Sequence, residues 1–250
     1  MSPPLVSIVT PVLNGARFLP DCLSSVRAQS HAPLEHIVVD GGSTDSTLAI
    51  LAAAPGVRVL QGRDRGLYDA LRKGFEAARG ELLAYQNADD RYAHEHAVAW
   101  AVEALAAHPE ADLVWGDFRW IDASGREVRD RPRRLAPRRQ DEIRRWNFVP
   151  PHATFVRTRL VRDEGLGPDP ELTYAGDWEW YLRLHLRGKR FLHLERVLAD
   201  FRLHGASKTS TVGLLAKARE WRLICRRHGL SFAAVAWNEL FWRPLRHRLA

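Results

Sequence analysis

Apolar strand-like runs alternate with amphipathic helical patterns through the first ninety residues. Strands are predicted at residues 6–10, 36–39, 57–60 and 82–85, and helices at about 18–26, 46–54 and 68–78. This alternation is typical of βαβ units, which build an open parallel sheet with helices on both faces. We expect Pro11 to end the first strand, and Gly80 to end the third helix in the left-handed conformation.

Each predicted strand of this first half runs directly into a polar loop. The loops comprise residues 10–14, 40–45, 61–66 and 87–90. Because ligands of open α/β sheets bind at the carboxyl ends of the strands, these four loops predict one binding edge. The last loop, Asn87-Ala88-Asp89-Asp90, brings carboxylates together, and such like charges are costly unless a cation compensates them. The alternative for this loop is a turn with solvated aspartates.

Composition narrows the class of protein. The chain of 250 residues is 46% hydrophobic with nine tryptophans, which is enough for a large folded core. Cys22 and Cys225 lack metal-site spacing and suggest no disulfide framework, so we expect a reducing, cytoplasmic compartment. The start of the chain does not resemble a signal peptide, and no 18-residue apolar run predicts a membrane span.

The second half is less regular. We expect a helix over 94–108, a tryptophan-rich strand over 112–121 and an arginine-rich connection over 125–145. Residues 1–206 are predicted to form one domain, with residues 1–110 binding nucleotide and residues 111–206 binding acceptor. Residues 207–250 are predicted to form a basic helical extension.

That C-terminal extension holds the whole net charge of +7, because it carries nine Lys and Arg residues against two Glu. A neutral body with a basic tail argues against a nucleic-acid binder. Helices are expected over 214–227 and 231–245. Apolar residues followed by Arg243, Arg246 and Arg248 favour peripheral contact with an anionic membrane on its inner face. Packing on the body, or oligomer formation, is the equal alternative.

Five segments in this order resemble the family 2 glycosyltransferases. They are Val6–Asn14, Ile37–Asp45, Asp64–Ala70, Gly80–Asp90 and Gly176–Leu184. The resemblance implies the Rossmann-like GT-A fold, with a mixed, mainly parallel sheet flanked by helices. It also implies an inverting transferase that moves a sugar from a nucleotide-diphospho-sugar to a saccharide or lipid-linked acceptor. Such a reaction would serve bacterial surface polysaccharide or glycolipid synthesis.

The same resemblance assigns residues to the nucleotide-sugar. They are Thr10, Pro11, Asn14, Asp40, Asp64, Lys73, Asn87, Ala88 and Asp89. Asp40 would accept a hydrogen bond from the base edge, and the alternative is a turn-capping residue. Many relatives have Asn-Lys-Gly where this chain has Arg72-Lys73-Gly74. The departure leaves open whether Arg72 or Lys73 meets phosphate, or whether both lie on a solvated helix face.

The Asn87–Asp89 segment stands where the family has its Asp-x-Asp motif, with Asn in the first position. By the resemblance, Asp89 ligates Mn²⁺ or Mg²⁺ on the diphosphate, Asp90 supports it from the next position, and His204 is a second candidate ligand. A metal-independent site is the alternative. His152 is expected to line the acceptor side.

Asp177 occupies the position of the family's general base, which deprotonates the acceptor hydroxyl. Relatives often have Glu-Asp where this chain has Gly176-Asp177, so the role falls on Asp177 alone. Glu179 is the second candidate, and a helix N-cap is the structural alternative for Asp177.

Two other functions remain open from the sequence. A sugar-1-phosphate nucleotidyltransferase would carry a glycine-rich loop after the first strand, which residues 10–14 do not supply. A catalytically degenerate nucleotide-sugar-binding protein is favoured by Asn87 and by Gly176, and opposed by the retained Asp40, Asp89 and Asp177.

Overall fold

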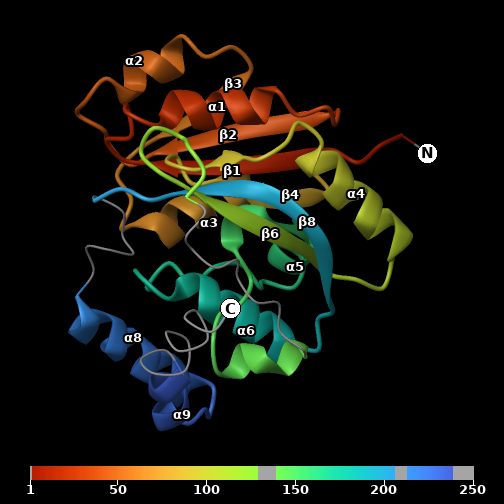
Figure 1. Ribbon diagram of the computed structural model, residues 1–250, viewed down its shortest axis with the longest axis vertical. Helices are drawn as coiled ribbons and strands as arrows, with labels where there is room; N and C mark the ends of the chain where they lie inside the picture. The colour runs from red at the N-terminus through yellow and green to blue at the C-terminus, as the bar shows by residue number, and fades with distance from the viewer. Residues whose placement is uncertain (1, 129–138, 206–212, 239–250) are drawn as a thin grey trace.

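The computed structural model describes residues 2–128, 139–205 and 213–238. Its first half follows the predicted alternation, with strands and helices stacked in layers (Figure 1). The elements are β1 (Val6–Val12), α1 (Leu19–Arg27), β2 (Leu34–Asp40), α2 (Thr47–Ala52), β3 (Val57–Gln61), α3 (Leu67–Ala77) and β4 (Leu82–Tyr85). These four strands are parallel to one another in the order β3-β2-β1-β4. The predicted parallel sheet is confirmed.

The second half extends the same sheet to eight strands, in the order β3-β2-β1-β4-β7-β6-β8-β5. Its elements are β5 (Arg91–Tyr92), α4 (Ala97–Ala107), β6 (Leu113–Ile121), η1 (Gln140–Arg144), η2 (Pro151–Ala153), β7 (Thr154–Arg157), α5 (Thr158–Arg162), α6 (Gly176–Leu186), β8 (Phe191–Arg202), α8 (Leu214–Arg227) and α9 (Phe232–Trp237). Strand β7 is antiparallel to β4 and β6, and β5 is antiparallel to β8. The sheet is therefore mixed, as expected.

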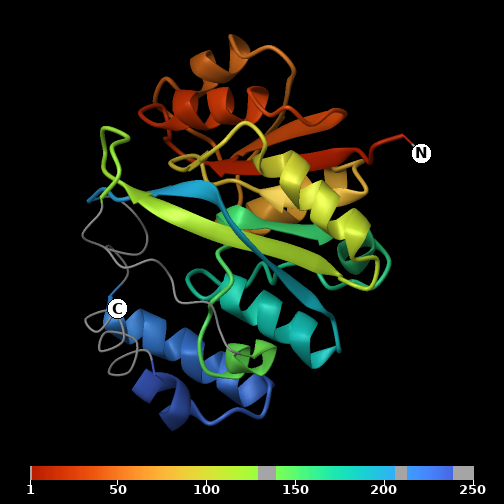
Figure 2. The ribbon, with the colours of Figure 1, turned by 45° about the vertical axis from the view of Figure 1, so that its right-hand side comes forward.

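Helices cover both faces of the sheet (Figures 1 and 2). Along β4, Leu82 and Ala84 pack in the cluster that contains α4, whereas Leu83 and Tyr85 pack in the cluster that contains α3 and α6. This period of two is what a strand buried on both faces requires. Helices α1 and α2 pack in a third cluster with β1 and β2.

Two local expectations differ from the structure. Pro11 lies inside β1, which continues to Val12 and pairs there with β2. Its missing N–H costs little, because the residue faces the side on which β4 has already ended opposite Val9. Helix α3 ends at Ala77, where Ala78 turns to an extended conformation. Gly80 instead allows close approach, since a Cβ there would lie 2.7 Å from Leu5 O.

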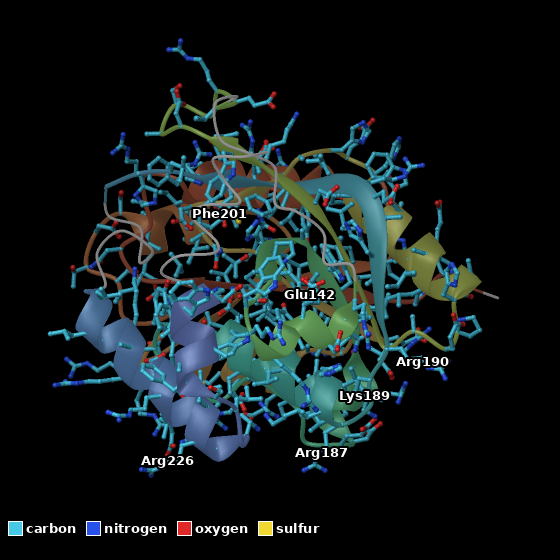
Figure 3. The ribbon with its side chains drawn as sticks, turned by 60° about the horizontal axis from the view of Figure 1, so that its bottom comes forward. Glu142, Arg187, Lys189, Arg190, Phe201 and Arg226 are labelled. Atoms are coloured by element: carbon cyan, nitrogen blue, oxygen red, sulfur yellow. The ribbon has the colours of Figure 1, made fainter. Side chains whose placement is uncertain are left out.

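The C-terminal helices pack on the body. The predicted helix over 214–227 is confirmed as α8, and its Trp221, Ile224 and Cys225 share a core cluster with α6. Figure 3 views this side, and the labelled, exposed Arg226 of α8 lies at the outer rim. Within the described residues, no helix combines the length and apolarity needed to cross a bilayer. Residues 239–250 lie outside the described residues, so membrane contact there stays a prediction.

Candidate functional site

The polar loops meet at one edge of the sheet through side chain–backbone contacts. Asn14 joins the loops after β1 and β2: its N–H donates to Ser43 Oγ at 2.8 Å, and its Oδ1 accepts from Thr44 N at 2.8 Å. The positive φ of 51° at Asn14 aims the chain this way, and Asn tolerates that conformation. A Cβ on Gly15 would lie 3.6 Å from Cβ of Ala88, so the loop after β4 adjoins the loop after β1.

The two carboxylate oxygens of Asp40 have different surroundings at this edge. Its Oδ1 accepts from the N–H groups of Gly42 and Ser43, both at 3.0 Å, which is the turn-capping role. Its Oδ2 is buried with no hydrogen-bond partner among the described residues, and the whole residue is 1% exposed. An unpartnered buried acceptor costs roughly 1–3 kcal/mol. Asp40 therefore caps a turn and also offers one oxygen to an incoming N–H donor.

Asp64 lies against the loop after β2. A Cβ on Gly41 would lie 2.5 Å from its Oδ2, so a larger residue there would displace this carboxylate. Oδ1 of Asp64 accepts from Gly66 N at 2.9 Å, which fixes the turn before α3. The third loop of the edge is thereby joined to the second, and the predicted convergence of four loops is observed.

The basic residues of α3 are engaged with Asp69. Lys73 lies 3.2 Å from Oδ2 of Asp69 and donates to Arg63 O at 2.8 Å, while Arg72 contacts Asp69 and Glu76. Desolvation opposes the charge on Asp69, but hydrogen bonds from the Arg65 N–H and from Lys73 and Arg72 lower its pKa to about 2. Lys73 thus holds the helix to its leading loop, whereas Arg72 is engaged within the helix.

Asp89 pairs with His204 across the sheet edge. Nε2 of His204 lies 2.8 Å from Oδ2 of Asp89, and the two residues are 115 positions apart in the chain. Asp90 is 1% exposed, and its two oxygens accept from Arg202 N at 2.8 Å and from Asn87 Nδ2 at 2.7 Å. Burial raises the pKa of Asp90, and the neighbouring charge of Asp89 adds to the rise.

Arg202 holds this loop in place. It is 1% exposed at the end of β8, beside the Phe201 labelled in Figure 3. Its Nε donates to Asp89 O at 2.8 Å, and its Nη2 donates to Asp21 Oδ2 at 2.8 Å on α1. The guanidinium also lies 4.9 Å from the ring centroid of Phe18. One buried arginine therefore connects β8, α1 and the loop after β4.

The Asp89–His204 pair fits a divalent cation that a diphosphate helps to hold. Among the residues that the structure describes, no three His, Cys, Asp or Glu side chains gather as a metal site. Mg²⁺ is commonly bound by one or two protein groups with the remaining positions taken by water and substrate phosphates. A carboxylate oxygen and an imidazole nitrogen 2.8 Å apart meet that lower requirement, and imidazole also suits Mn²⁺ among the transition metals.

Asp177 is held from three directions at the start of α6. Its Oδ2 accepts from Asn147 Nδ2 at 2.8 Å, and its Oδ1 accepts from Trp178 N at 2.9 Å. The Tyr68 hydroxyl lies 3.3 Å from the same Oδ1. Burial raises the pKa of Tyr68 well above its usual value, with the charge of Asp177 adding to it, so the phenol stays a neutral donor. Asn147 and Tyr68 were not assigned to the site from the sequence.

The glycine before Asp177 has a steric cause. A Cβ on Gly176 would lie 2.5 Å from Cε2 of the Tyr68 ring. The glutamate that relatives often carry at this position would not fit beside that ring. Gly176 is thus part of the packing that brings Tyr68 to Asp177.

Four of the predicted site residues lie elsewhere or face inward, namely Thr10, Pro11, Glu179 and His152. The Thr10 side chain is fully buried and lies 2.9 Å from His36 Nε2, and Pro11 is buried within β1, because both sit inside the strand and not in its loop. Glu179 is 3% exposed and pairs with Arg183 and His228. It faces α8, so it does not accompany Asp177.

His152 packs behind the site. It is 3% exposed, its Nδ1 lies 3.8 Å from Asp90 Oδ2, and its ring contacts Phe118 and Phe201. It therefore supports Asp90 from the core and does not line an open acceptor surface.

Comparison with known proteins agrees with this geometry. Residues 7–164 match the model of the glycosyl transferase family 2. The chain belongs to this family. It is 39% identical over 132 residues to a PGL/p-HBAD biosynthesis glycosyltransferase of Mycobacterium bovis, covering 48% of this chain and 52% of that protein. It is 36% identical over 189 residues to an uncharacterized glycosyltransferase of Mycobacterium tuberculosis, covering 74% and 70%. The chain thus spans about half the length of the first of these relatives.

Solved structures that are similar to this chain have the GT-A fold. S. aureus TarS 1-349 in complex with UDP-GlcNAc superposes with a TM-score of 0.72, at 20% identity, covering 88% of this chain and 65% of that one. The mannosyltransferase PcManGT of Pyrobaculum calidifontis, in complex with GDP-Man and Mn²⁺, gives 0.71 at 18% identity, covering 96% and 71%. At this identity the likeness establishes the fold, and the expected GT-A architecture is confirmed.

Proposed function

We propose that this chain transfers a sugar from a nucleotide-diphospho-sugar to an acceptor hydroxyl, with inversion at the anomeric carbon. The observation that carries the proposal is the unpartnered, buried Oδ2 of Asp40 at the edge that also presents Asp89. A base N–H would satisfy that oxygen, and a diphosphate would extend toward Asp89. Asp64 and Asn14 shape the loops on either side of this path.

A divalent cation completes the donor side of the proposed site. Asp89 and His204 would hold Mn²⁺ or Mg²⁺, and the ion would neutralise charge on the departing nucleoside diphosphate. A metal-bound neighbour, PcManGT with GDP-Man and Mn²⁺, supports the assignment. Asp90 and Arg202 keep the Asp89 loop in position from the buried side.

Asp177 supplies the acceptor-side chemistry. Its carboxylate would take the proton from the acceptor hydroxyl as that oxygen attacks the anomeric carbon from the side opposite the leaving diphosphate. Asn147 has a fixed orientation for this task, because its Oδ1 accepts from Val149 N at 3.0 Å and turns its NH₂ toward Asp177. The carboxylate is thereby held in one position for the incoming hydroxyl.

The relatives suggest the class of product. Two are named for PGL/p-HBAD biosynthesis and for O-antigen biosynthesis, the latter a Myxococcus xanthus protein 38% identical over 129 residues. That match covers 49% of this chain and 10% of the Myxococcus protein. We therefore propose a saccharide or lipid-linked acceptor, glycosylated on the cytoplasmic side during surface glycolipid or polysaccharide synthesis.

The test is a hydrolysis and transfer assay with UDP-, GDP- and dTDP-sugars in the presence of Mn²⁺ or Mg²⁺. The wild-type chain should turn over at least one donor, and Asp177→Asn should lower kcat by roughly 10²- to 10⁴-fold while donor binding is kept. Glu179→Gln is the matched control and should retain transfer. Full transfer by Asp177→Asn would show that the base is a different group.

A further inference from the structure

The C-terminal helix α8 reaches the turn that precedes α6. Oε2 of Glu220 accepts from Tyr174 N at 2.9 Å and from Ala175 N at 2.8 Å, and Oε1 accepts from Thr173 N at 2.8 Å. Glu220 is half-buried there. One carboxylate from the extension thus binds three consecutive backbone N–H groups of the body.

This contact lies at the start of a helix that has no side-chain N-cap: one of the three N–H groups belongs to the N-cap residue Ala175, and the other two precede it. The first N–H groups of a helix lack intrahelical partners, and a side chain at the N-cap normally accepts from one of them. In α6 the N-cap is Ala175, which has no such side chain. A negative charge beside a helix N-terminus is also favoured by the helix dipole. Glu220 therefore serves the start of α6 from a position 45 residues along the chain.

The turn held by Glu220 leads directly to Asp177. The Tyr68 hydroxyl lies 3.2 Å from Tyr174 O and 3.3 Å from Asp177 Oδ1, so it contacts the turn and the carboxylate together. Between them, Gly176 packs on the Tyr68 ring. A shift of the turn by a fraction of an ångström would move Tyr68 and Asp177 with it.

We propose that Glu220 is a positioning residue for Asp177, so that the C-terminal extension is part of the acceptor side of the enzyme. The proposal rests on the proposed function of Asp177 as the base. It adds that the body without α8 would bind donor and transfer slowly.

Arg227 offers a matched control within the same helix. It pairs with Asp169 Oδ2 at 2.6 Å and with Glu171 Oε2 at 3.1 Å. These contacts also join α8 to the body, but they lie before the turn of residues 173–175 and do not touch it. Arg227→Ala therefore weakens docking while leaving the three Glu220 bonds in place.

The test compares Glu220→Ala, Glu220→Gln and Arg227→Ala in the full chain. Amide hydrogen exchange over residues 173–178 should rise about tenfold in Glu220→Ala and stay unchanged in Arg227→Ala. The kcat for transfer should fall about tenfold in Glu220→Ala, with the donor KM within twofold of wild type. Glu220→Gln should fall between, because one oxygen can still accept from Tyr174 and Ala175 while the bond from Thr173 is lost.

Three results would overturn the proposal. They are unchanged exchange in Glu220→Ala, an equal fall of kcat in Arg227→Ala, and a loss of donor binding that parallels the loss of kcat. The last two would mean that α8 acts only by stabilising the fold. If the wild-type chain transferred no sugar, the proposed function would fail, while the exchange experiment would still decide whether Glu220 holds the turn.

Discussion

The proposed donor edge and the proposed acceptor side of this molecule are built in different ways. At the donor edge, Asp40 ends its strand, Asp64 lies in the loop after its strand, and both bond to backbone two or three residues away. On the acceptor side, Asp177 depends on Tyr68 and Asn147, which lie 109 and 30 residues away in the chain.

The difference shows how one sheet serves two kinds of site. Parallel strands bring their loops to a common edge whatever the loop sequences are, so a donor site needs only short motifs. A base that faces an acceptor has no such shared edge and must be placed by tertiary contacts. The Asp89 loop belongs to both classes, since its motif is local but Arg202 and His204 of the β8 end complete it.

The largest effect is expected at the donor edge, from Asp89→Ala. Loss of the carboxylate leaves His204 alone to meet the cation, and metal-dependent affinity for a nucleoside diphosphate should fall about 10³-fold, which is about 4 kcal/mol. Calorimetric titration with and without Mn²⁺ measures it. Asp45→Ala, at the same edge but bonded to Thr47 and Ala16, is the control and should bind within threefold of wild type. Equal metal-dependent affinity in Asp89→Ala and wild type would show that Asp89 does not hold a cation at the donor edge.

Arg202→Met tests whether the Asp89 loop needs its distant partner. The guanidinium is buried, whereas its partner Asp21 is 52% exposed. The substitution leaves the Asp89 carbonyl without its donor, so the free energy of unfolding should fall by roughly 1–3 kcal/mol. Urea unfolding measures the change. Arg91→Met is the comparison, because Arg91 likewise forms an ion pair, with Asp200, but is one-third exposed. Its removal leaves Arg119 paired with the same carboxylate. A similar loss of unfolding free energy in both variants would show that Arg202 contributes no more to stability than a partly exposed arginine does.

The same contrast explains what the sequence could predict. The first four strands, their order of loops, α8 and the positions of Asp40, Asp89 and Asp177 follow from local apolar runs and short motifs. Period and turn chemistry act within a few residues, and a parallel topology then brings the loops together. The strands and α8 are confirmed, whereas the roles of Asp40, Asp89 and Asp177 stay predictions.

The remaining features depend on contacts that a local pattern does not carry. Strand β8 was not predicted, because its apolar residues are interrupted by Glu195 and Arg196. The ion pairs of Asp200 and the contacts that buried Arg202 makes with Asp21 and Asp89 were therefore missed. Thr10 was expected at the end of its strand, whereas β1 continues for two more residues, to Val12. Glu220 resembled any solvated charge of a basic helix until α8 was seen against α6.

Gly176→Ala tests the packing on the acceptor side. A Cβ at this position would lie 2.5 Å from the Tyr68 ring, and overpacking of this kind typically costs about 1–3 kcal/mol. We expect a loss of about 2 kcal/mol in stability and a lower kcat, because Tyr68 would be pushed from Asp177. Gly213→Ala is the control, since a Cβ there meets no atom of the described residues within 4 Å. If Gly176→Ala were as stable and active as wild type, the contact between Tyr68 and Gly176 would not position the base.

The smallest effect concerns pH and the donor half. His36 is buried in β2 beside Thr10, and burial lowers its pKa from 6.5 to about 4. The unfolded chain therefore takes up a proton as the pH falls below 6.5, whereas the folded chain does so only near 4, and stability is lost across that window. Between pH 7.5 and 5.5 the loss from this residue should be about 1 kcal/mol. Urea unfolding at both pH values gives the change in free energy of unfolding between pH 7.5 and 5.5 for wild type and for His36→Gln. The difference between these two changes measures the contribution of His36. Identical changes would mean that the imidazole is solvated or protonated in the fold, and that the donor half is less tightly packed behind its edge than the contacts of Thr10 indicate.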